Sequence, residues 1–565
     1  MLHDGVLEFS TLKDGGTASA IGSSVNFAQN WIADGGTYRY TGGNTSTDRS
    51  MKLSSTSTFD IKSATVTMNG VIEGSDASAN FIIDGSGQLT VGTTKFFGYK
   101  GATVLKGGTH YLSTTHISKN GIGSSSKLVL AGGHLKTKGE TNSSETYSFP
   151  IEVQDETTSQ FSPNRLCTLT STVTGGGTLQ WNIPYLREYI RGNWTGFTGR
   201  VIANGANSSS SEGSLFVFDS GYASVMANVP ITLTGNARLC AWDTNANGAI
   251  GGLSGNAGTY LTGSSKQTDN FKCTWTVGAA NTDETFNGII NNWSCSGKGH
   301  TGTTSIVKVG TGDWRLTGKN EYSGTTQVSA GRLIVNGTNS GTGSVTVAAD
   351  AILGGKGTIA GTVTIQNGGT LQVGDDKVSD SGLKLTGGLK LNSGAILQLN
   401  EAMMTATFSK GQKIQAFTGT VSSGTFAEIL PTTPGDGLKW DTSALYTSGI
   451  MKVIGEDEEP GEEPIVDPTP AVEYKTALLT WDNMTVSTDG TLDASKTDGT
   501  KANNILTGNK GGDAEGITMK LTGNLTKSYT SADAISASST SAKTVKLSNG
   551  AENTSTSPTA TWPPA

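Results

Sequence analysis

The stretch GTGDWRLTGKNEYSGTTQVSAGRLIVNG, residues 310–337, decides the fold. Near its end, Gly331 precedes a short run of alternating side chains that places Leu333 and Val335 on one face and Ile334 on the other. A glycine can turn a corner with a positive φ, and alternation over a few residues is typical of a half-buried β-strand. The stretch therefore predicts a strand that is entered through a tight turn, with Leu333 and Val335 facing inward.

The same unit, a glycine followed by a short alternating strand, recurs along the chain. The aligned glycines are Gly36, Gly108, Gly133, Gly177, Gly331, Gly369 and Gly388. Their spacings are near multiples of a unit of roughly nineteen to twenty-five residues, and a period in this range indicates a solenoid. Because the unit is short and poor in helix formers, we expect an all-β, right-handed parallel β-helix, with the handedness that parallel connections prefer.

Composition agrees with a stacked architecture. Glycine supplies 78 of the 565 residues, hydrophobic residues make up 34% and charged residues 15%. The net charge of −7 equals the charge of residues 456–468, which hold seven acidic residues and neither Lys nor Arg. The remaining charges balance, so the sequence has no excess of basic residues of the kind that binds nucleic acid. No apolar run approaches the ~20 residues of a membrane-spanning helix.

A change of composition after residue 453 divides the chain. We expect a β-solenoid over residues 1–454, an acidic Pro/Glu-rich linker over 455–472, and a small β-domain over 473–565. The sequence shows no signal peptide at its start, and its last residues, NTSTSPTATWPPA, have neither alternation nor a cap. We therefore expect a fragment at both ends, with the small β-domain truncated.

The stretch 310–337 resembles the passenger-associated repeat of autotransporter-type secreted proteins. Weaker similarity to such passengers covers residues 4–50 and about 250–453. The resemblance implies a β-helix that is secreted to the surface of a Gram-negative bacterium, and it implies no catalysis. The positions that match the repeat are Gly310, Thr311, Gly312, Trp314, Leu316, Gly318, Asn320, Tyr322, Ser323, Gly324, Thr326, Val328, Gly331, Leu333, Val335, Asn336 and Gly337.

A β-helix is also the scaffold of pectin-degrading enzymes, so carboxylates must be examined. An NTD triplet occurs at residues 281–283 and an acidic pair at Asp375 and Asp376. These are separated by several coils, and neither the GHG nor the RIK motif of polygalacturonase-like chains is present. The pattern favours turn residues over a catalytic centre, and we predict that the chain is not an enzyme.

Metal and cofactor sites are not predicted either. The sequence DTNANG, residues 243–248, matches the first half of a calcium loop, but Ser254 stands where such a loop needs a bidentate Glu. His110 and His116 lie near one strand, and the side chains of such a pair more often stand on a ladder of paired strands than bind a metal. The favoured interpretation of residues 243–248 is a surface turn, and that of the two histidines is a position on a ladder of strands.

The four cysteines have no C-x-x-C spacing and no nearby histidine. The favoured interpretation is that of buried thiols within a sheet, and a bridge between Cys240 and Cys273 stays open. The cysteines are Cys167, Cys240, Cys273 and Cys295.

The segment YLREYIRGNW, residues 185–194, is the best candidate for ligand recognition. As a strand it would separate a face of tyrosines and arginines from a face that holds Leu186, Glu188 and Ile190. Aromatic faces stack on sugar rings, and guanidinium groups suit the carboxylates of acidic glycans. The alternative is a short helix that packs Leu186 and Ile190 on the solenoid. The predicted glycan-binding residues are Tyr185, Arg187, Tyr189, Arg191 and Trp194.

Two functions agree with these features. The first is a non-catalytic cell-surface stalk, adhesin or display scaffold. The second is an accessory part of a secreted polysaccharide lyase or hydrolase with a pectin-type substrate. In both, the expected partner is a cell-surface or plant-type polysaccharide, with no nucleic acid and no cofactor.

Overall fold

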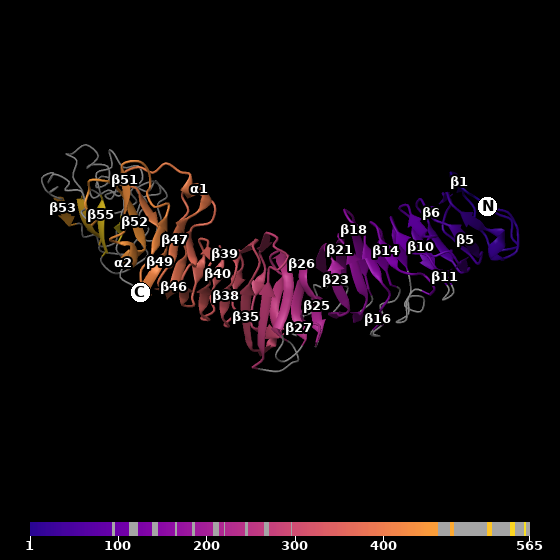
Figure 1. Ribbon diagram of the computed structural model, residues 1–565, viewed down its shortest axis with the longest axis horizontal. Helices are drawn as coiled ribbons and strands as arrows, with labels where there is room; N and C mark the ends of the chain where they lie inside the picture. Colours follow the sequence, from indigo (N-terminus) through magenta and orange to yellow (C-terminus); the bar gives the residue numbers. More distant parts are fainter. Residues whose placement is uncertain are drawn as a thin grey trace, which may run out of the picture. The chain divides into compact units, whose positions relative to one another are not determined.

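The structure is a computed structural model in which the chain forms two compact units, Met1–Gly461 and Glu462–Ala565. Figure 1 shows the chain coloured from its N-terminus to its C-terminus, with strand and helix labels. Described residues are 1–92, 96–111, 123–137, 145–163, 166–183, 187–206, 214–219, 221–242, 247–264, 270–294, 297–461, 475–478, 517–521, 543–547 and 559–560.

In the first half of the first unit, successive coils contribute parallel strands to three faces. The first face contains β1 (Val6–Phe9), β3 (Thr37–Tyr40), β6 (Ser57–Ile61), β9 (Phe81–Asp84), β12 (Thr103–Leu105), β14 (Leu128–Leu130), β17 (Ile151–Val153), β20 (Thr172–Gly175) and β23 (Asn193–Phe197). The second begins with β2 (Ile32–Asp34), β5 (Met51–Ser55), β8 (Ile72–Gly74) and β11 (Phe97–Tyr99). Later coils have in the same place β16 (Glu145–Tyr147), β19 (Cys167–Leu169), β22 (Arg187–Ile190), β25 (Ser214–Asp219), β27 (Ala237–Trp242), β29 (Tyr260–Ser264) and β32 (Ile289–Ile290). We call these seven strands the β16–β32 sheet.

The third face continues into the second half of the unit. It contains β4 (Thr45–Thr47), β7 (Thr65–Met68), β10 (Gln88–Val91), β13 (Thr109–Tyr111), β15 (His134–Lys136), β18 (Thr158–Ser162), β21 (Thr178–Ile183), β24 (Arg200–Gly205), β26 (Met226–Gly235), β28 (Asn247–Gly255), β30 (Lys272–Val277), β35 (Thr303–Lys308), β38 (Thr326–Val328), β41 (Val345–Val347), β44 (Val363–Ile365) and β46 (Lys384–Leu391). A ladder that starts at β28 contains β31 (Glu284–Phe286), β36 (Asp313–Leu316), β39 (Gly331–Val335), β42 (Ala351–Gly354), β45 (Thr370–Val373), β47 (Ile396–Leu399) and β50 (Glu428–Leu430). A third ladder contains β37 (Lys319–Asn320), β40 (Thr338–Asn339), β43 (Thr358–Ile359), β46 and β49 (Thr418–Ser423).

Each repeat in the sequence corresponds to one coil of the β-helix. Leu316 pairs with Val335 in the parallel register of β36 and β39, nineteen residues further on. Gly331 has a φ of 61°, and a Cβ at this position would lie 2.4 Å from the carbonyl oxygen of Gly310 in the preceding coil. Only glycine combines this conformation with so close an approach. The recurring glycines therefore mark corners where one coil passes directly over another.

Alternation along each strand fills the interior of the first unit. A single cluster of buried apolar side chains extends from Phe9 to Val453. Edge-to-face rings follow one another inside it: Trp181 lies 4.9 Å from Phe161 and 5.5 Å from Phe216, centroid to centroid. The predicted all-β fold and parallel β-helix are confirmed, since stacked coils bury their inward side chains against one another.

The parallel arrangement ends before residue 453, which corrects the expectation of a continuous parallel helix up to that point. An antiparallel sheet with the strand order β48, β52, β51 is formed by segments on either side of the last parallel strands, β49 and β50. Its elements, with two short helices, are β48 (Lys413–Gln415), β51 (Leu438–Asp441), β52 (Ile450–Gly455), α1 (Glu401–Met404) and α2 (Leu445–Ser448). An antiparallel sheet changes the strand direction, so it covers the end of the stack without continuing it.

The described part of the second unit is one sheet with the order β53, β54, β55, β56. Its strands are β53 (Lys475–Leu478), β54 (Ile517–Leu521), β55 (Lys543–Leu547) and β56 (Thr559–Ala560). Among the described residues of both units, no helix has the length and apolar character needed to cross a membrane.

Candidate functional site

The predicted recognition segment forms strand β22, between β19 and β25 in the β16–β32 sheet. Glu188 and Ile190 are fully buried, whereas Arg187 and Tyr189 are partly exposed. The expected division of this segment into two faces is confirmed for these residues, and the alternative of a short helix is wrong. Tyr185 lies outside the described residues.

Trp194 does not share the outward face, so this part of the prediction is wrong. The chain turns at Gly192, which has a φ of 81°, and Trp194 enters strand β23 of the first face. Its side chain is 2% exposed, its indole N–H donates to the carbonyl of Arg191 at 3.0 Å, and its ring lies 5.5 Å from that of Phe197. A buried indole stabilises the corner and offers no surface to a sugar.

The register of the sheet extends the outward face over further coils. Arg187 pairs with Leu215 of β25, Leu215 pairs with Arg238 of β27, and Arg238 pairs with Tyr260 of β29. Side chains that share a column point to the same side of a sheet. Arg238 and Tyr260 therefore lie on the face that begins with Arg187. The sequence alone did not reveal this column, because its members are one coil apart and the coils differ in length.

Aromatic rings and guanidinium groups stack on one another along this face. The guanidinium carbon of Arg238 lies 4.9 Å above the ring of Tyr260, and the rings of Tyr260 and Trp293 are stacked at 5.7 Å with an interplanar angle of 29°. At the strand ends, the guanidinium of Arg191 lies 5.6 Å from the ring of Tyr222, which is 37% exposed. We call the following set the arginine–aromatic face: Arg187, Arg191, Tyr222, Arg238, Tyr260 and Trp293.

A small apolar cluster lies on this same side of the sheet, because Leu215 pairs with Arg187 and Val217 pairs with Tyr189. Leu215, Val217 and Cys240 are buried together, and the ring of Tyr189 packs against them. Cys240 is disulfide-bonded, whereas Cys273 is a free buried thiol. The bridge between these two cysteines, left open by the sequence, is not formed.

Beneath the face, Glu188 points into the solenoid. Thr168 pairs with Tyr189, which places Cys167 beside Glu188 in the interior. Burial raises the pKa of the Glu188 carboxyl well above its ordinary value, and the neighbouring Glu145 adds to the shift. The shift favours the neutral form of the carboxyl, because an ion in this apolar interior would lose its hydration.

The first group of carboxylates considered for catalysis has structural roles. Asn281 has a φ of 60°, and its side-chain oxygen accepts the backbone N–H of Thr311 at 2.9 Å. Asp283 accepts the backbone N–H of Asp313 at 2.8 Å. Each side chain thus joins one turn to the corresponding turn of the next coil, as the interpretation as turn residues predicts.

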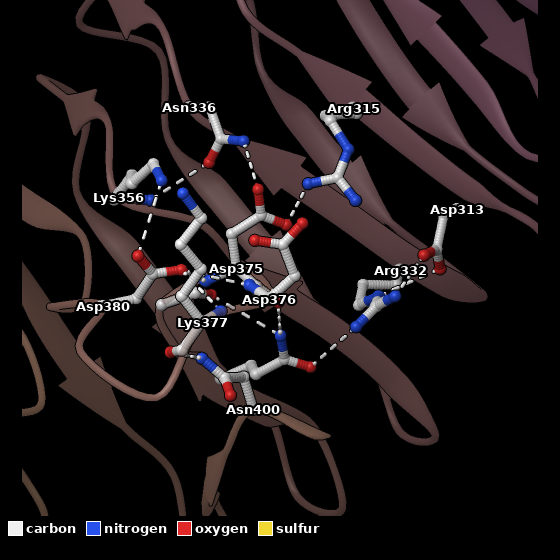
Figure 2. Close-up of polar contacts among 12 residues, drawn as sticks. Asp313, Arg315, Arg332, Asn336, Lys356, Asp375, Asp376, Lys377, Asp380 and Asn400 are labelled. Atoms are coloured by element: carbon white, nitrogen blue, oxygen red, sulfur yellow. Dashed lines mark hydrogen bonds and ion pairs between the residues drawn. The ribbon is translucent and has the colours of Figure 1, made fainter. Parts of the chain in front are cut away.

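The second group lies on the loop after β45 (Figure 2). Asp375 is buried and accepts hydrogen bonds from the guanidinium of Arg315 and, at 2.6 Å, from the amide of Asn336. Asp376 is exposed. A carboxylate that is held by two donors in this way stabilises a loop.

Asp380 fixes the same loop from within (Figure 2). Its Oδ2 accepts three consecutive backbone N–H groups, those of residues 375–377, at 3.0 to 3.3 Å, and Lys356 lies 3.4 Å from its Oδ1. Burial raises the pKa of Asp380, but these donors outweigh it and hold the pKa below its ordinary value. We call Arg315, Lys356, Asp375 and Asp380 the carboxylate cluster.

The loop also explains why Ile334 is fully buried although its position points outward. Ile334 pairs with Arg315 in the register of β39 and β36, and Arg315 is bonded to Asp375 of the loop. The loop covers this part of the sheet. An alternating pattern identifies the side of a strand, but it does not reveal what covers that side.

His110 is buried, and its Nδ1 accepts the backbone N–H of Leu89 at 3.3 Å; burial lowers the pKa of His110 to about 4. His116 and residues 243–246 of the DTNANG sequence lie outside the described residues. Within the part of the chain that the structure describes, no group of three or more His, Cys, Asp or Glu side chains is arranged to hold a metal ion.

Comparison with known proteins identifies one segment of the β-helix. The family described as the passenger-associated-transport-repeat matches residues 306–335, which extend from β35 to the end of β39. Residues 306–335 are such a repeat. The resemblance to autotransporter passengers is thereby confirmed, and the repeat corresponds to one and a half coils of the solenoid.

The passenger-like chain is also similar to the adhesin BmaC autotransporter of Brucella suis biovar 1 (strain 1330). The two are 33% identical over 158 residues. The aligned part is 26% of this chain and 4% of the relative, so the chain spans a small fraction of the relative's length.

Proposed function

We propose that the chain is a non-catalytic, adhesin-type passenger displayed at the surface of a Gram-negative bacterium. The observation that carries this proposal is the passenger-associated repeat, which is an integral part of the β-helix. The relative in Brucella suis is named an adhesin, and this name supports the same role here. In this proposal the β-helix is the stalk, and the arginine–aromatic face contacts the target.

The contacts of the candidate carboxylates support a non-catalytic role. A glycoside hydrolase needs two carboxyl groups that flank one substrate bond, and a lyase needs carboxylates that hold a cation next to a base. Asp283 and Asp375 instead hold backbone and side-chain donors of neighbouring coils. Their hydrogen bonds stabilise turns in two different parts of the solenoid.

Two further features support an extracellular location. Cys240 is in a disulfide, and disulfides persist in oxidising compartments such as the cell exterior. The ladders pair the backbone groups of successive coils, which suits a stalk that must keep its structure outside the cell.

Display on living cells tests the adhesin role. The 565-residue chain is fused to a heterologous outer-membrane anchor in a non-adherent Gram-negative laboratory strain, and retention is counted on cultured cells and on polysaccharide-coated surfaces. We expect retention above that of the anchor alone. Equal retention on every surface would contradict the proposal.

Incubation with polygalacturonate tests the absence of catalysis. We expect neither new reducing ends nor unsaturated-uronide absorbance, with or without calcium. Cleavage that disappears in the Asp283→Ala variant would show an enzyme and would favour the accessory or catalytic polysaccharide-degrading role instead.

A further inference from the structure

We infer that the third face of the first unit binds a linear, uncharged glycan that runs along the axis of the solenoid. This inference rests on the proposed adhesin role, for which it names a class of ligand. The residues that carry it lie on β18, β21, β24 and β26, in a different sheet from the arginine–aromatic face. We call the following set the amide–hydroxyl face: Gln160, Ser162, Gln180, Asn182, Asn204 and Thr234.

The register of the third face places these side chains in two columns. Asn182 pairs with Asn204, and Asn204 pairs with Thr234 of the next coil. In the second column, Gln160 pairs with Gln180. The residues that lie between the two columns in each strand are buried in the interior, so the columns themselves point outward.

The amide–hydroxyl face is accessible to solvent along its length. All six side chains are partly exposed, although each has neighbours in the adjacent coils. On the β16–β32 sheet, by contrast, the outward residues Leu215 and Val217 are fully buried. A ligand can therefore reach the amide–hydroxyl face in the structure as it stands.

Hydrogen bonds between neighbouring coils hold the amide groups in place. The Nδ2 of Asn182 donates to the Oε1 of Gln160 at 3.2 Å, and the Nδ2 of Asn204 donates to the Oδ1 of Asn182 at 2.9 Å. The hydroxyl of Thr234 donates to the Oδ1 of Asn204 at 3.0 Å. Within one strand, the Nε2 of Gln180 donates to the Oδ1 of Asn182 at 2.9 Å. Side chains that are held in this way lose less conformational entropy when a ligand binds.

These hydrogen bonds leave donors and acceptors for a ligand. An amide group has two N–H donors and an oxygen with two lone pairs. Among the described residues, nothing bonds to the Oε1 of Gln180 or to the Nε2 of Gln160, and neither atom is buried. Asn204 uses one N–H and one lone pair, so it keeps one of each. The face therefore offers both kinds of hydrogen-bonding group.

The charge of this surface favours an uncharged partner. Within the described strands β18, β21, β24 and β26, Arg200 alone is charged, and its two terminal nitrogens donate to the carboxylate of Glu284 at 3.1 and 2.6 Å. The uncharged stretch begins after β15, where the ammonium of Lys136 lies 5.5 Å from the centre of the Tyr111 ring. A charged ligand would lose hydration here without gaining an opposite charge.

Sugar rings combine the groups that this surface can bind. Each sugar hydroxyl donates and accepts a hydrogen bond, as the amide groups do. Ile202, which pairs with Gln180, is partly exposed beside the columns and offers apolar contact to the C–H face of a ring. An uncharged glycan therefore matches both the polar and the apolar part of the surface.

The spacing of the coils indicates a linear ligand. Neighbouring strands lie ~4.8 Å apart, so Asn182, Asn204 and Thr234 follow one another at this interval along the axis. The interval is close to the length of one sugar unit in an extended β-linked chain. Successive sugar units can therefore meet successive coils.

Titration calorimetry on the full chain tests the inference with uncharged hexasaccharides of two shapes. Cellohexaose, mannohexaose and xylohexaose are extended β-linked chains, whereas maltohexaose contains the same glucose units as cellohexaose in a curved, α-linked chain. We expect at least one extended hexasaccharide to bind about tenfold more tightly than maltohexaose. Its affinity should not change as salt rises, because the contact contains no ion pair.

Variants separate the contribution of the amides from that of apolar contact. Gln180→Met with Asn204→Leu preserves side-chain size, removes two amides and should weaken binding of the extended chain about tenfold. Ile202→Thr keeps the β-branched shape with less apolar surface, and should weaken binding by a smaller factor. Gln398→Met, which removes a partly exposed amide from β47 in another ladder, is the matched control and should bind as wild type. Circular dichroism and thermal unfolding verify that each variant folds.

The outcomes distinguish this inference from the adhesin role on which it rests. The inference is wrong if no extended hexasaccharide binds, if maltohexaose binds equally well, or if only the acidic hexagalacturonate binds. Unchanged affinity in the folded double variant and in Ile202→Thr would also overturn it. If the displayed chain nevertheless mediates retention on cells, the adhesin role stands with another ligand. If retention is absent as well, both are wrong.

Discussion

The arginine–aromatic face and the carboxylate cluster both place arginines on outward surfaces of the same β-helix, yet they use them differently. In the carboxylate cluster, Arg315 is bonded to a buried aspartate, and the loop that carries this aspartate covers the sheet. On the arginine–aromatic face, Arg191 and Arg238 lie against tyrosine rings and remain partly exposed. The guanidinium of Arg315 thus fixes a loop through a carboxylate, whereas the guanidinium groups of Arg191 and Arg238 pack against the faces of aromatic rings.

The two regions also contain buried carboxyl groups whose pKa values are shifted in opposite directions. Glu188, beneath the arginine–aromatic face, has a raised pKa, because it is buried without compensating charge. Asp380, in the carboxylate cluster, has a lowered pKa, because backbone donors and Lys356 favour its ionised form. The first carboxyl makes the fold less stable as the pH rises, and the second makes it less stable as the pH falls.

The largest expected effect comes from Glu188. A carboxyl with a raised folded pKa contributes its full stability below its unfolded pKa of about 4.3. That contribution is lost as the pH rises toward the raised folded pKa, by about 1.4 kcal/mol per pH unit. Glu188→Gln should remove this slope in urea unfolding at several pH values. Exposed Glu73→Gln is the control and should keep the slope; a variant at residue 188 that keeps it too would contradict the assignment.

Asp380 should show a smaller effect with the opposite dependence on pH. Asp380→Ala leaves three backbone N–H groups and Lys356 without their acceptor, and should cost about 2 kcal/mol of unfolding free energy at pH 7. The cost should begin to shrink as the pH falls below the unfolded pKa of about 3.9, and it should vanish once the pH lies below the lowered pKa of the folded carboxyl. Asp376→Ala, on the exposed side of the same loop, should change stability by less than about 0.5 kcal/mol. Equal losses in the two variants would show that the loop, and not this carboxylate, matters.

The smallest effect is expected at the half-buried pair of Arg332 and Asp313. Arg332→Gln should lower the unfolding free energy by about 1 kcal/mol, and by less in 1 M salt, which screens the pair. Lys319→Gln, whose partner Glu321 is 3.5 Å away on an exposed surface, should have almost no effect. A loss at residue 332 that does not depend on salt would indicate packing instead of charge.

The sequence predicted the repeated fold because each coil contains its own signal. Gly331 and the alternating residues Leu333 and Val335 are enough to predict one strand and its corner, and stacking repeats this signal in every coil. The burial of Ile334 could not be predicted, because it depends on a loop forty residues away. The antiparallel end of the unit was missed for the same reason, since strand direction is set by tertiary packing.

Part of the candidate site could be predicted from the sequence. Arg187 and Tyr189 were correctly assigned to one face, because alternation within a strand is local. Trp194 was assigned to this face in error, because the turn at Gly192 moves the chain into another sheet. Arg238 and Tyr260 could be found only from the register, which coils of unequal length conceal.

The most direct test of the account is the retention of cells that display the chain on cultured cells and on polysaccharide-coated surfaces, compared with cells that carry the anchor alone. The account predicts that cells displaying the chain are retained better than the anchor alone on at least one of these surfaces. Equal retention on every surface would contradict it.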